Sequence, residues 1–179
     1  MGGYRNNDQR MSVGGFTLLE LLITLLLVGI MAAWGLPNFQ ALGERTAQTS
    51  AVNRLQSAFA LARNTAISQR RQMTICPATQ DHTACDDQWS HALMIIKGDK
   101  TESIQANDIL RVVPAQQNTE VAYSRGWSRI RYSTLGYTSG YNGSFSICSG
   151  SGGERSQGKK LVLSQLGRLR IDEAPIDCD

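Results

Sequence analysis

Histidine is scarce in this chain of 179 residues, since His82 and His91 are the only two. They leave little scope for a Ser-His-Asp arrangement, which needs a histidine as its proton carrier. A phosphate-binding loop is also missing, because neither Gly150-Ser151-Gly152-Gly153 nor Gly158-Lys159-Lys160 has the required Gly-Lys-Ser/Thr sequence. The net charge of +3 is small and is not by itself a sign of a nucleic-acid partner. We therefore expect no enzymatic activity and no cofactor.

A long apolar run, Phe16 to Leu36, stands near the start of the chain. A membrane-spanning helix needs about 20 predominantly apolar residues, so this run is long enough. Its strongly polar side chains are those of Thr17, Glu20 and Thr24. A carboxylate at the bilayer centre costs about 2.5–3.5 kcal/mol or more, so Glu20 is expected to need a partner.

The segment Met1–Gly15 before this run is short and polar, and it carries Arg5 and Arg10. A secretory signal has a shorter apolar region followed by a small-residue cleavage site. Here the small pair Gly14-Gly15 precedes the apolar run instead. Cleavage at this pair would leave the apolar segment on the mature protein.

The sequence from Gly14 to Glu20 closely resembles the class III signal of type IV pilins and type II secretion pseudopilins. The resemblance implies that a prepilin peptidase cuts after Gly15 and N-methylates Phe16. It also implies that Glu20 pairs with the terminal amine of a neighbouring subunit. The implied partners are the peptidase, other pilins or pseudopilins and the bacterial inner membrane. The head would lie in the periplasm before assembly.

Four cysteines in a chain with an export signal suggest disulfides formed in an oxidising compartment. Three pairings are possible, and we favour Cys76–Cys85, which closes a short loop, with Cys148–Cys178, which ties the last residues to the body. Zinc is the competing interpretation, but the cysteine spacings do not match the usual C-x2-4-C patterns. We expect no metal site.

Three regions follow from these patterns: a cleaved leader at 1–15, a transmembrane or filament-core helix at 16–42, and a globular head at 43–179. Pro37 is expected to bend the helix without ending it. Beyond it, apolar residues recur three and four positions apart, as on the core-facing side of a helix. That apolar stripe is Phe39, Leu42, Val52, Leu55, Phe59, Ala62 and Ala66, and the solvent side is Arg54, Ser57, Asn64 and Ser68.

After Arg71 the pattern changes to short β-type runs separated by turn residues. We expect an α+β fold in which one antiparallel sheet packs on the amphipathic half of the helix. The expected strands are Gln72–Cys76, Ala92–Lys97, Ile109–Val113, Glu120–Ser124, Arg129–Ser133, Ser144–Cys148, Lys160–Ser164 and Arg168–Ile171.

The head resembles the GspH/FimT family of minor pilins and pseudopilins. The resemblance lies in Met73–Pro77, Cys85, Asp87–Ser90, Leu93–Ile96 and Gly167–Arg170. It implies the pilin "lollipop" fold and a structural role as a low-abundance subunit, near the tip of a type IV pilus or a type II secretion pseudopilus. The two machines use the same leader and head, so both stay open.

DNA binding for natural transformation is the alternative function. The basic residues Lys159, Lys160, Arg168 and Arg170 could contact phosphates. In some FimT-like proteins a late Gly-Arg-x-Arg motif is linked to DNA binding, and 167–170 matches it. The acidic residues that follow at 172, 173, 177 and 179 would repel phosphate. A second basic cluster, Arg125, Arg129 and Arg131, lies beside the aromatic residues Trp127 and Tyr132.

Overall fold

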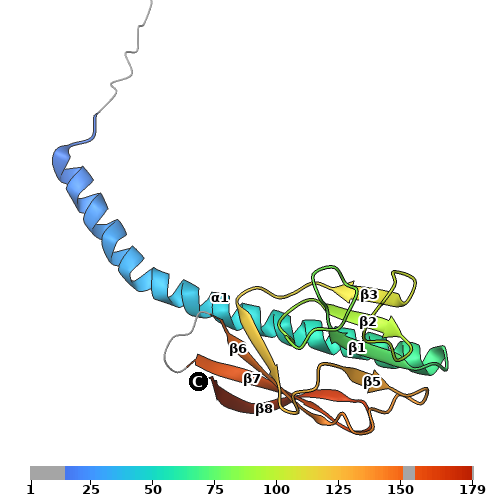
Figure 1. Cartoon of the computed structure of the whole chain (residues 1–179). Coiled ribbons are helices and arrows are strands. Elements are labelled where there is room, and N and C mark those ends of the chain that lie inside the picture. Colours follow the sequence, from blue (N-terminus) through green and yellow to red (C-terminus); the bar gives the residue numbers. More distant parts are fainter. Residues whose placement is uncertain (1–14, 151–155, 179) are drawn as a thin grey trace, which may run out of the picture. The chain divides into compact units, whose positions relative to one another are not determined.

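A computed structural model describes residues 15–150 and 156–178 of the chain (Figure 1). The expected leader therefore lies outside the described residues, apart from Gly15. The chain divides into two compact units, Met1–Gln40 and Ala41–Asp179. All strands and both disulfides belong to the second unit, which we call the head.

A single helix, α1 (Leu18–Ser68), begins in the first unit and ends in the head. The backbone N–H of Glu20 donates a hydrogen bond to the Thr17 hydroxyl at 3.3 Å, so Thr17 caps the helix. Pro37 does not interrupt the helix, as expected. The segment Leu18–Gly35 has a mean hydropathy of 2.2 and buries none of its residues, and by length and composition it can cross a membrane.

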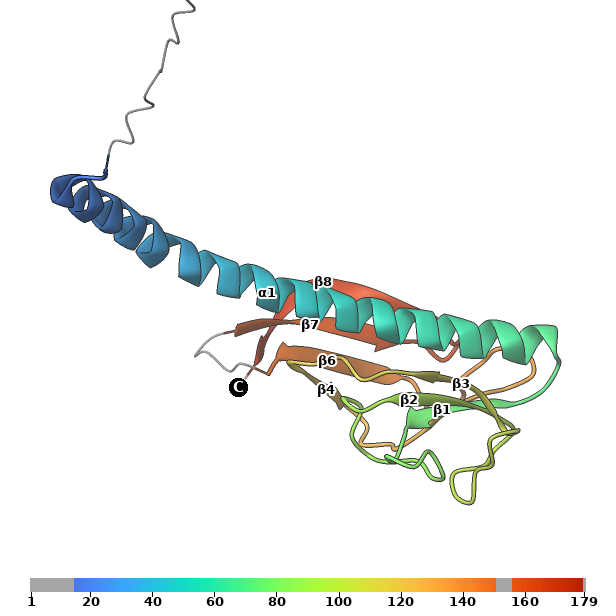
Figure 2. The same ribbon diagram turned by 90° about the horizontal axis from the view of Figure 1, so that it is seen from above.

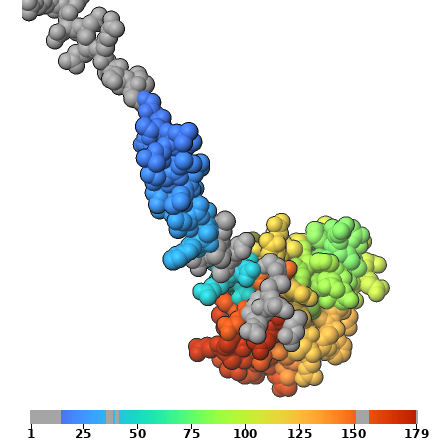
Figure 3. Space-filling model, turned by 90° about the vertical axis from the view of Figure 1, so that its left-hand side faces the viewer, coloured from blue at the N-terminus to red at the C-terminus, as the bar shows by residue number. Residues whose placement is uncertain are grey.

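In the described part of the chain, eight antiparallel strands form two sheets of four. The first sheet has the order β3-β2-β1-β5, and the second has the order β4-β6-β7-β8. Their bounds are β1 (Met73–Pro77), β2 (Leu93–Lys97), β3 (Ile109–Val113), β4 (Thr119–Tyr123), β5 (Ile130–Tyr132), β6 (Gly143–Ser149), β7 (Ser156–Leu163) and β8 (Leu169–Cys178). In a space-filling view the green segments and the red segments occupy different sides of the head (Figure 3).

The α+β class and the position of each strand agree with the sequence, but the expectation of one sheet is wrong. The alternation of apolar and polar residues along a segment identifies a strand and its buried face. Which strands pair with each other depends instead on contacts between segments that are distant in the sequence. Strand β7 begins four residues earlier than expected, at Ser156, and strand β8 is longer than expected and continues to Cys178. Strand β8 lies at the edge of its sheet. Acidic residues and proline are tolerated on edge strands, and in β8 they hide the alternation of apolar and polar residues that would identify a strand.

The core lies between one face of α1 and the inner faces of both sheets (Figure 2). Phe59 stands at its centre, within ring-packing distance of Trp89, Tyr132 and Phe145. The buried face of the helix is Ala51, Val52, Leu55, Ala58, Phe59, Ala62 and Ala66. The small alanines allow the sheets to approach the helix closely.

Two expectations about the helix faces are wrong. Phe39 and Leu42 belong to the predicted core stripe but are exposed, because the stripe begins to pack only at Ala51. Arg54 belongs to the predicted solvent side but is only 8% exposed. Its guanidinium donates a hydrogen bond to the backbone carbonyl of His91, which draws the side chain under the loop before β2.

Candidate functional site

The expected cleavage position, between Gly15 and Phe16, lies in a short segment without regular structure directly before α1. A Cβ atom added to Gly15 would meet nothing within 4 Å. The fold of the described chain therefore does not require glycine there. Phe16 is 85% exposed, so both sides of this peptide bond are accessible.

Glu20 lies in the first turn of α1. A negative charge there interacts favourably with the helix macrodipole, by about 0.3–1 kcal/mol at exposed sites. Among residues 15–150 and 156–178, its carboxylate forms no salt bridge. The dipole term is smaller than the cost of a carboxylate inside a bilayer, which is about 2.5–3.5 kcal/mol or more. A positively charged group beside Glu20 is therefore needed, in addition to the helix dipole, if this turn enters a membrane or a filament core.

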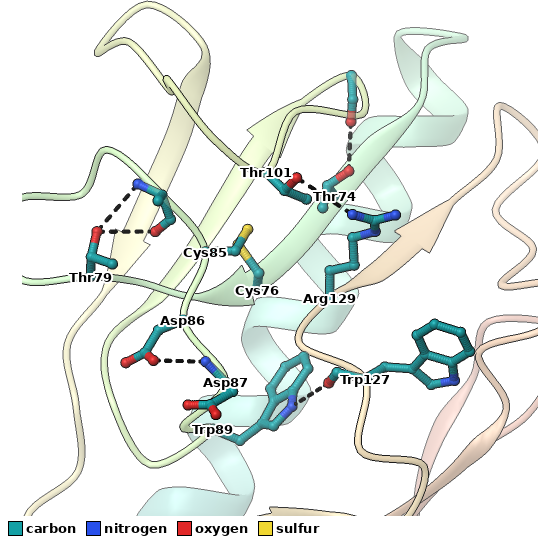
Figure 4. Close-up of a disulfide and its surroundings, with 12 residues drawn as sticks. Thr74, Cys76, Thr79, Cys85, Asp86, Asp87, Trp89, Thr101, Trp127 and Arg129 are labelled. Atoms are coloured by element: carbon teal, nitrogen blue, oxygen red, sulfur yellow. Dashed lines mark hydrogen bonds between the residues drawn. A yellow bond between two sulfur atoms is a disulfide. The ribbon is translucent and has the colours of Figure 1, made fainter.

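Both disulfides favoured by the sequence are present. Cys76 is bonded to Cys85, and the hairpin that they close lies beside a turn anchored by Trp89 (Figure 4). The Trp89 indole N–H donates a hydrogen bond of 2.9 Å to the backbone carbonyl of Trp127 (Figure 4). This bond joins the disulfide region to the connection between β4 and β5.

The Cys148–Cys178 disulfide joins β6 to β8 across the intervening strand β7. Gly158 of β7 lies directly beneath it, and a Cβ there would come within 2.5 Å of the Cys178 sulfur and 2.8 Å of the Ile147 carbonyl oxygen. Only a residue without a side chain fits this crossing. The disulfide thus holds the end of edge strand β8 against the sheet.

The two histidines lie in or near the disulfide hairpin. His91 Nδ1 is 2.5 Å from the Asp86 carboxylate, and His82 adopts a positive φ of 58° in a turn. In the same turn, hydrogen bonds from the Thr83 and Thr79 hydroxyls lower the pKa of Asp81 to about 2. These groups organise the turn.

The four basic residues predicted as a DNA site do not form one strip. The Lys159 ammonium donates to the Thr49 hydroxyl of α1 at 2.8 Å, on the helix side of the sheet. Lys160, the next residue on the strand, points to the other side and pairs with Asp172 at 3.4 Å. Arg168 and Arg170 are exposed and form no salt bridge among the described residues.

The second basic cluster is also divided. The Arg131 guanidinium pairs with Asp99 at 2.8 Å, and Arg125 donates to the Asn142 carbonyl at 3.0 Å. Tyr132 is fully buried, so it cannot stack on a base. Trp127 is half exposed and packs against Tyr141.

Comparisons with known families match both parts of the chain. Residues 51–167 match the model of the type II transport protein GspH, and residues 10–36 match the model of the prokaryotic N-terminal methylation motif. The first match covers more than half of the chain. The chain belongs to the GspH family.

Relatives of this GspH-family chain include two curated proteins of Pseudomonas aeruginosa, each called fimbrial protein. Both are 33% identical to it over 94 residues, which are 52% of this chain and 59% of theirs. The chain therefore matches less than two thirds of the length of these relatives.

Solved structures of the type IV minor pilin FimU of P. aeruginosa strain PAO1 have a similar fold. The structure in space group P21 has a TM-score of 0.58 and 24% identity, and covers 72% of this chain and 90% of FimU. The structure in space group P65 has a TM-score of 0.56 and 25% identity, with 69% and 91% covered. The pilin-like fold inferred from the sequence is thus confirmed.

The GspH family consists of structural pilin-like proteins and is not a known enzyme family. Its match to this chain ends at Gly167, so Arg168, Arg170 and the whole of β8 lie beyond it. The methylation motif instead covers Gly15, Phe16 and Glu20.

Two features of the site could not be found from the sequence. Arg54 looks like a solvent-side helical residue, but burial lowers its pKa to about 10. Two of its guanidinium nitrogens have no hydrogen-bond partner among the described residues. Gly158 looks like an ordinary turn glycine, and the Cys178 sulfur and the Ile147 carbonyl oxygen that close over it explain its identity.

Proposed function

We propose that this GspH-family protein is a minor pilin or pseudopilin, cut after Gly15 and methylated at Phe16. The observation that carries the proposal is the methylation-motif match over residues 10–36, which includes an exposed apolar helical segment with one carboxylate. A single-pass chain of this kind would wait in the bacterial inner membrane with its head in the periplasm. Assembly would then place it in a type IV pilus or a type II secretion pseudopilus.

Glu20 is the assembly residue in this proposal. Cleavage after Gly15 creates a new amine at Phe16, four residues before Glu20 on the same chain. A buried charge is tolerated when it is paired and is very costly when it is alone. The amine of a neighbouring subunit would supply the pair inside the filament core.

Processing is tested by mass spectrometry of the mature N-terminus in cells that have the prepilin peptidase. We expect the mature chain to begin at Phe16 and to carry one methyl group. Cleavage after Ala32 or Ala33 would show that the apolar run is a removed signal and would contradict the proposal.

The role of Glu20 is tested by Glu20→Val, with Thr24→Val as the matched control in the same apolar segment. Removing the carboxylate leaves membrane insertion intact, since the charge opposes insertion. It removes the pairing group, so we expect the fraction of the chain recovered in sheared filaments to fall at least about tenfold, the effect of losing about 1.4 kcal/mol or more. The control should assemble normally, and equal assembly of both variants would contradict the pairing role.

The choice between the two machines is tested by deleting the gene and restoring it. Loss of surface pili and twitching with intact secretion would assign the chain to a type IV pilus, and the reverse would assign it to a secretion pseudopilus. A tip position predicts that immunogold labels one end of each filament.

DNA binding is the second candidate, because Arg168 and Arg170 have no salt-bridge partner among the described residues. A phosphate-binding site would give an affinity that falls steeply with salt, since each neutralised phosphate releases condensed counterions. We expect the head to show no more binding near physiological salt than a protein of similar charge. Tight binding that Arg168→Gln with Arg170→Gln weakens, while Arg45→Gln with Arg111→Gln does not, would make DNA uptake the primary function.

A further inference from the structure

Charges are distributed unequally along the head. We call the end where α1 finishes at Ser68 the far end, and the end where α1 enters at Ala41 the near end. Three segments form the far end, 63–72, 133–139 and 164–170, and together they contain five arginines and no acidic residue. The residues 171–178 of β8, which run back to the near end, include three acidic residues and no basic one.

Specific contacts hold the three far-end segments together. The Arg63 Nε donates to the Gly136 carbonyl oxygen at 3.2 Å, and the Thr138 backbone N–H donates to the Gln165 carbonyl at 3.0 Å. The Tyr132 hydroxyl donates to the Gly167 carbonyl at 3.2 Å beneath them. The far end is therefore one built surface.

Apolar side chains project from this surface. Leu135 is 69% exposed and Leu166 is 54% exposed, and Ile67 and Tyr137 beside them are also exposed. These four residues come from the three far-end segments, and the contacts above bring them to one end of the head. Contiguous exposed apolar residues with a charged rim are typical of a protein interaction surface.

The near end has a hollow of about 430 Å³ on the outer face of the second sheet. Glu120 and Asp177 lie at this hollow, and Ala122 and Ile176 contribute apolar surface to it. Lys160 also lines it, but its ammonium is paired with Asp172. The hollow is therefore negatively charged, with an apolar part.

The basic far end and the acidic hollow cannot meet within one molecule. Strand β7 runs from the near end, where Ser156 pairs with Cys178, to the far end, where Leu163 pairs with Leu169. A strand of this length spans roughly 20–25 Å at about 3.3 Å per residue. The two surfaces have opposite charge and apolar centres, so they are complementary between copies.

We propose that the far end of one head docks into the Glu120–Asp177 hollow of a second copy of this chain. Leu135 and Leu166 enter the hollow, and Arg71 and Arg168 face Glu120 and Asp177. The contact uses different surfaces on the two copies, so it is heterologous and extends along one direction instead of closing a symmetric dimer. This inference goes beyond the proposed assembly through Glu20 and does not depend on cleavage.

The test uses the isolated head, Ala41–Asp179, which contains the whole buried core and both disulfides. Circular dichroism and thiol titration first verify that each variant is folded and oxidised. A photoreactive p-benzoylphenylalanine replaces Leu166, and equal amounts of ¹⁵N-labelled and unlabelled heads are irradiated at high concentration. We expect mixed-isotope cross-links to the segments 119–123 and 176–178 of the other copy. The same probe at Glu102, on an exposed loop of the first sheet, should give no such cross-links.

Charge reversal separates this contact from non-specific association. Reversing the far end (Arg71→Glu, Arg168→Glu) or the hollow (Glu120→Lys, Asp177→Lys) should each lower the cross-link yield at least about fivefold, because like charges then face each other. Mixing the two variants should restore the yield, since each now complements the other. Arg111→Glu on β3 should have no effect. Cross-links that map elsewhere, their absence, or failure of the mixture to recover would overturn the proposal.

Discussion

Gly167 begins the Gly-Arg-Leu-Arg sequence that resembles a DNA-binding motif, but its surroundings indicate a structural role. Its φ is +74°, in the left-handed region that side-chain-bearing residues rarely adopt. A Cβ atom there would lie 2.2 Å from the Gly136 carbonyl oxygen and 2.8 Å from the ring of buried Tyr132. We therefore predict that Gly167→Ala strongly destabilises the head.

The magnitude has two parts. The left-handed backbone costs about 1–2 kcal/mol for a residue with a Cβ. The steric overlap adds about 1–3 kcal/mol, which is typical of inserting a carbon into a packed region. The Gly136 carbonyl cannot move away freely, because it accepts the hydrogen bond from Arg63. The expected loss of unfolding free energy is therefore about 2–5 kcal/mol.

Gly140→Ala is the matched control. Gly140 has a φ of +84°, and a Cβ there would meet nothing within 4 Å. The Gly140→Ala head should lose only the unfolding free energy that comes from the left-handed backbone, about 1–2 kcal/mol. Urea unfolding of the oxidised heads, followed by tryptophan fluorescence, measures both changes. Equal losses in the two variants would refute the steric argument, and a stable Gly167→Ala head with altered DNA affinity would support the motif as a binding element.

Three further predictions concern groups in the head. Arg54→Met should raise the unfolding free energy by about 1–3 kcal/mol in urea, since it removes a buried charge with no acidic partner; a loss would mean that the hydrogen bond to the loop outweighs desolvation. Replacing Cys148 and Cys178 by alanine should cost about 3–4 kcal/mol for their separation of 30 residues, measured by urea unfolding against the oxidised wild-type head. The folded pKa of Asp81 is lowered to about 2, so its carboxylate stabilises the head above its unfolded pKa, and this stabilisation is lost as the pH falls towards 2. Thr83→Val should move the NMR titration midpoint of Asp81 upward. An unchanged midpoint would exclude the Thr83 hydroxyl as the cause of the lowered pKa.

The sequence alone determined the features that depend on local order. The Gly14–Glu20 motif, the apolar run after it and the continuation of the helix through Pro37 are all read along one segment. Strand positions followed from side-chain alternation, because each strand must present one face to the core. The disulfide pairing was a preference among three possibilities, and the structure confirms it.

Only the tertiary structure decided which distant groups meet. The division into two sheets depends on pairing partners, and local alternation does not encode them. Arg54 is buried because a loop 37 residues away in sequence supplies its hydrogen-bond acceptor. Lys159 and Lys160 diverge because neighbouring residues on a strand face opposite sides of the sheet. Gly158 is required because the Cys178 sulfur and the Ile147 carbonyl oxygen close over it, so its role exists only once the head is folded.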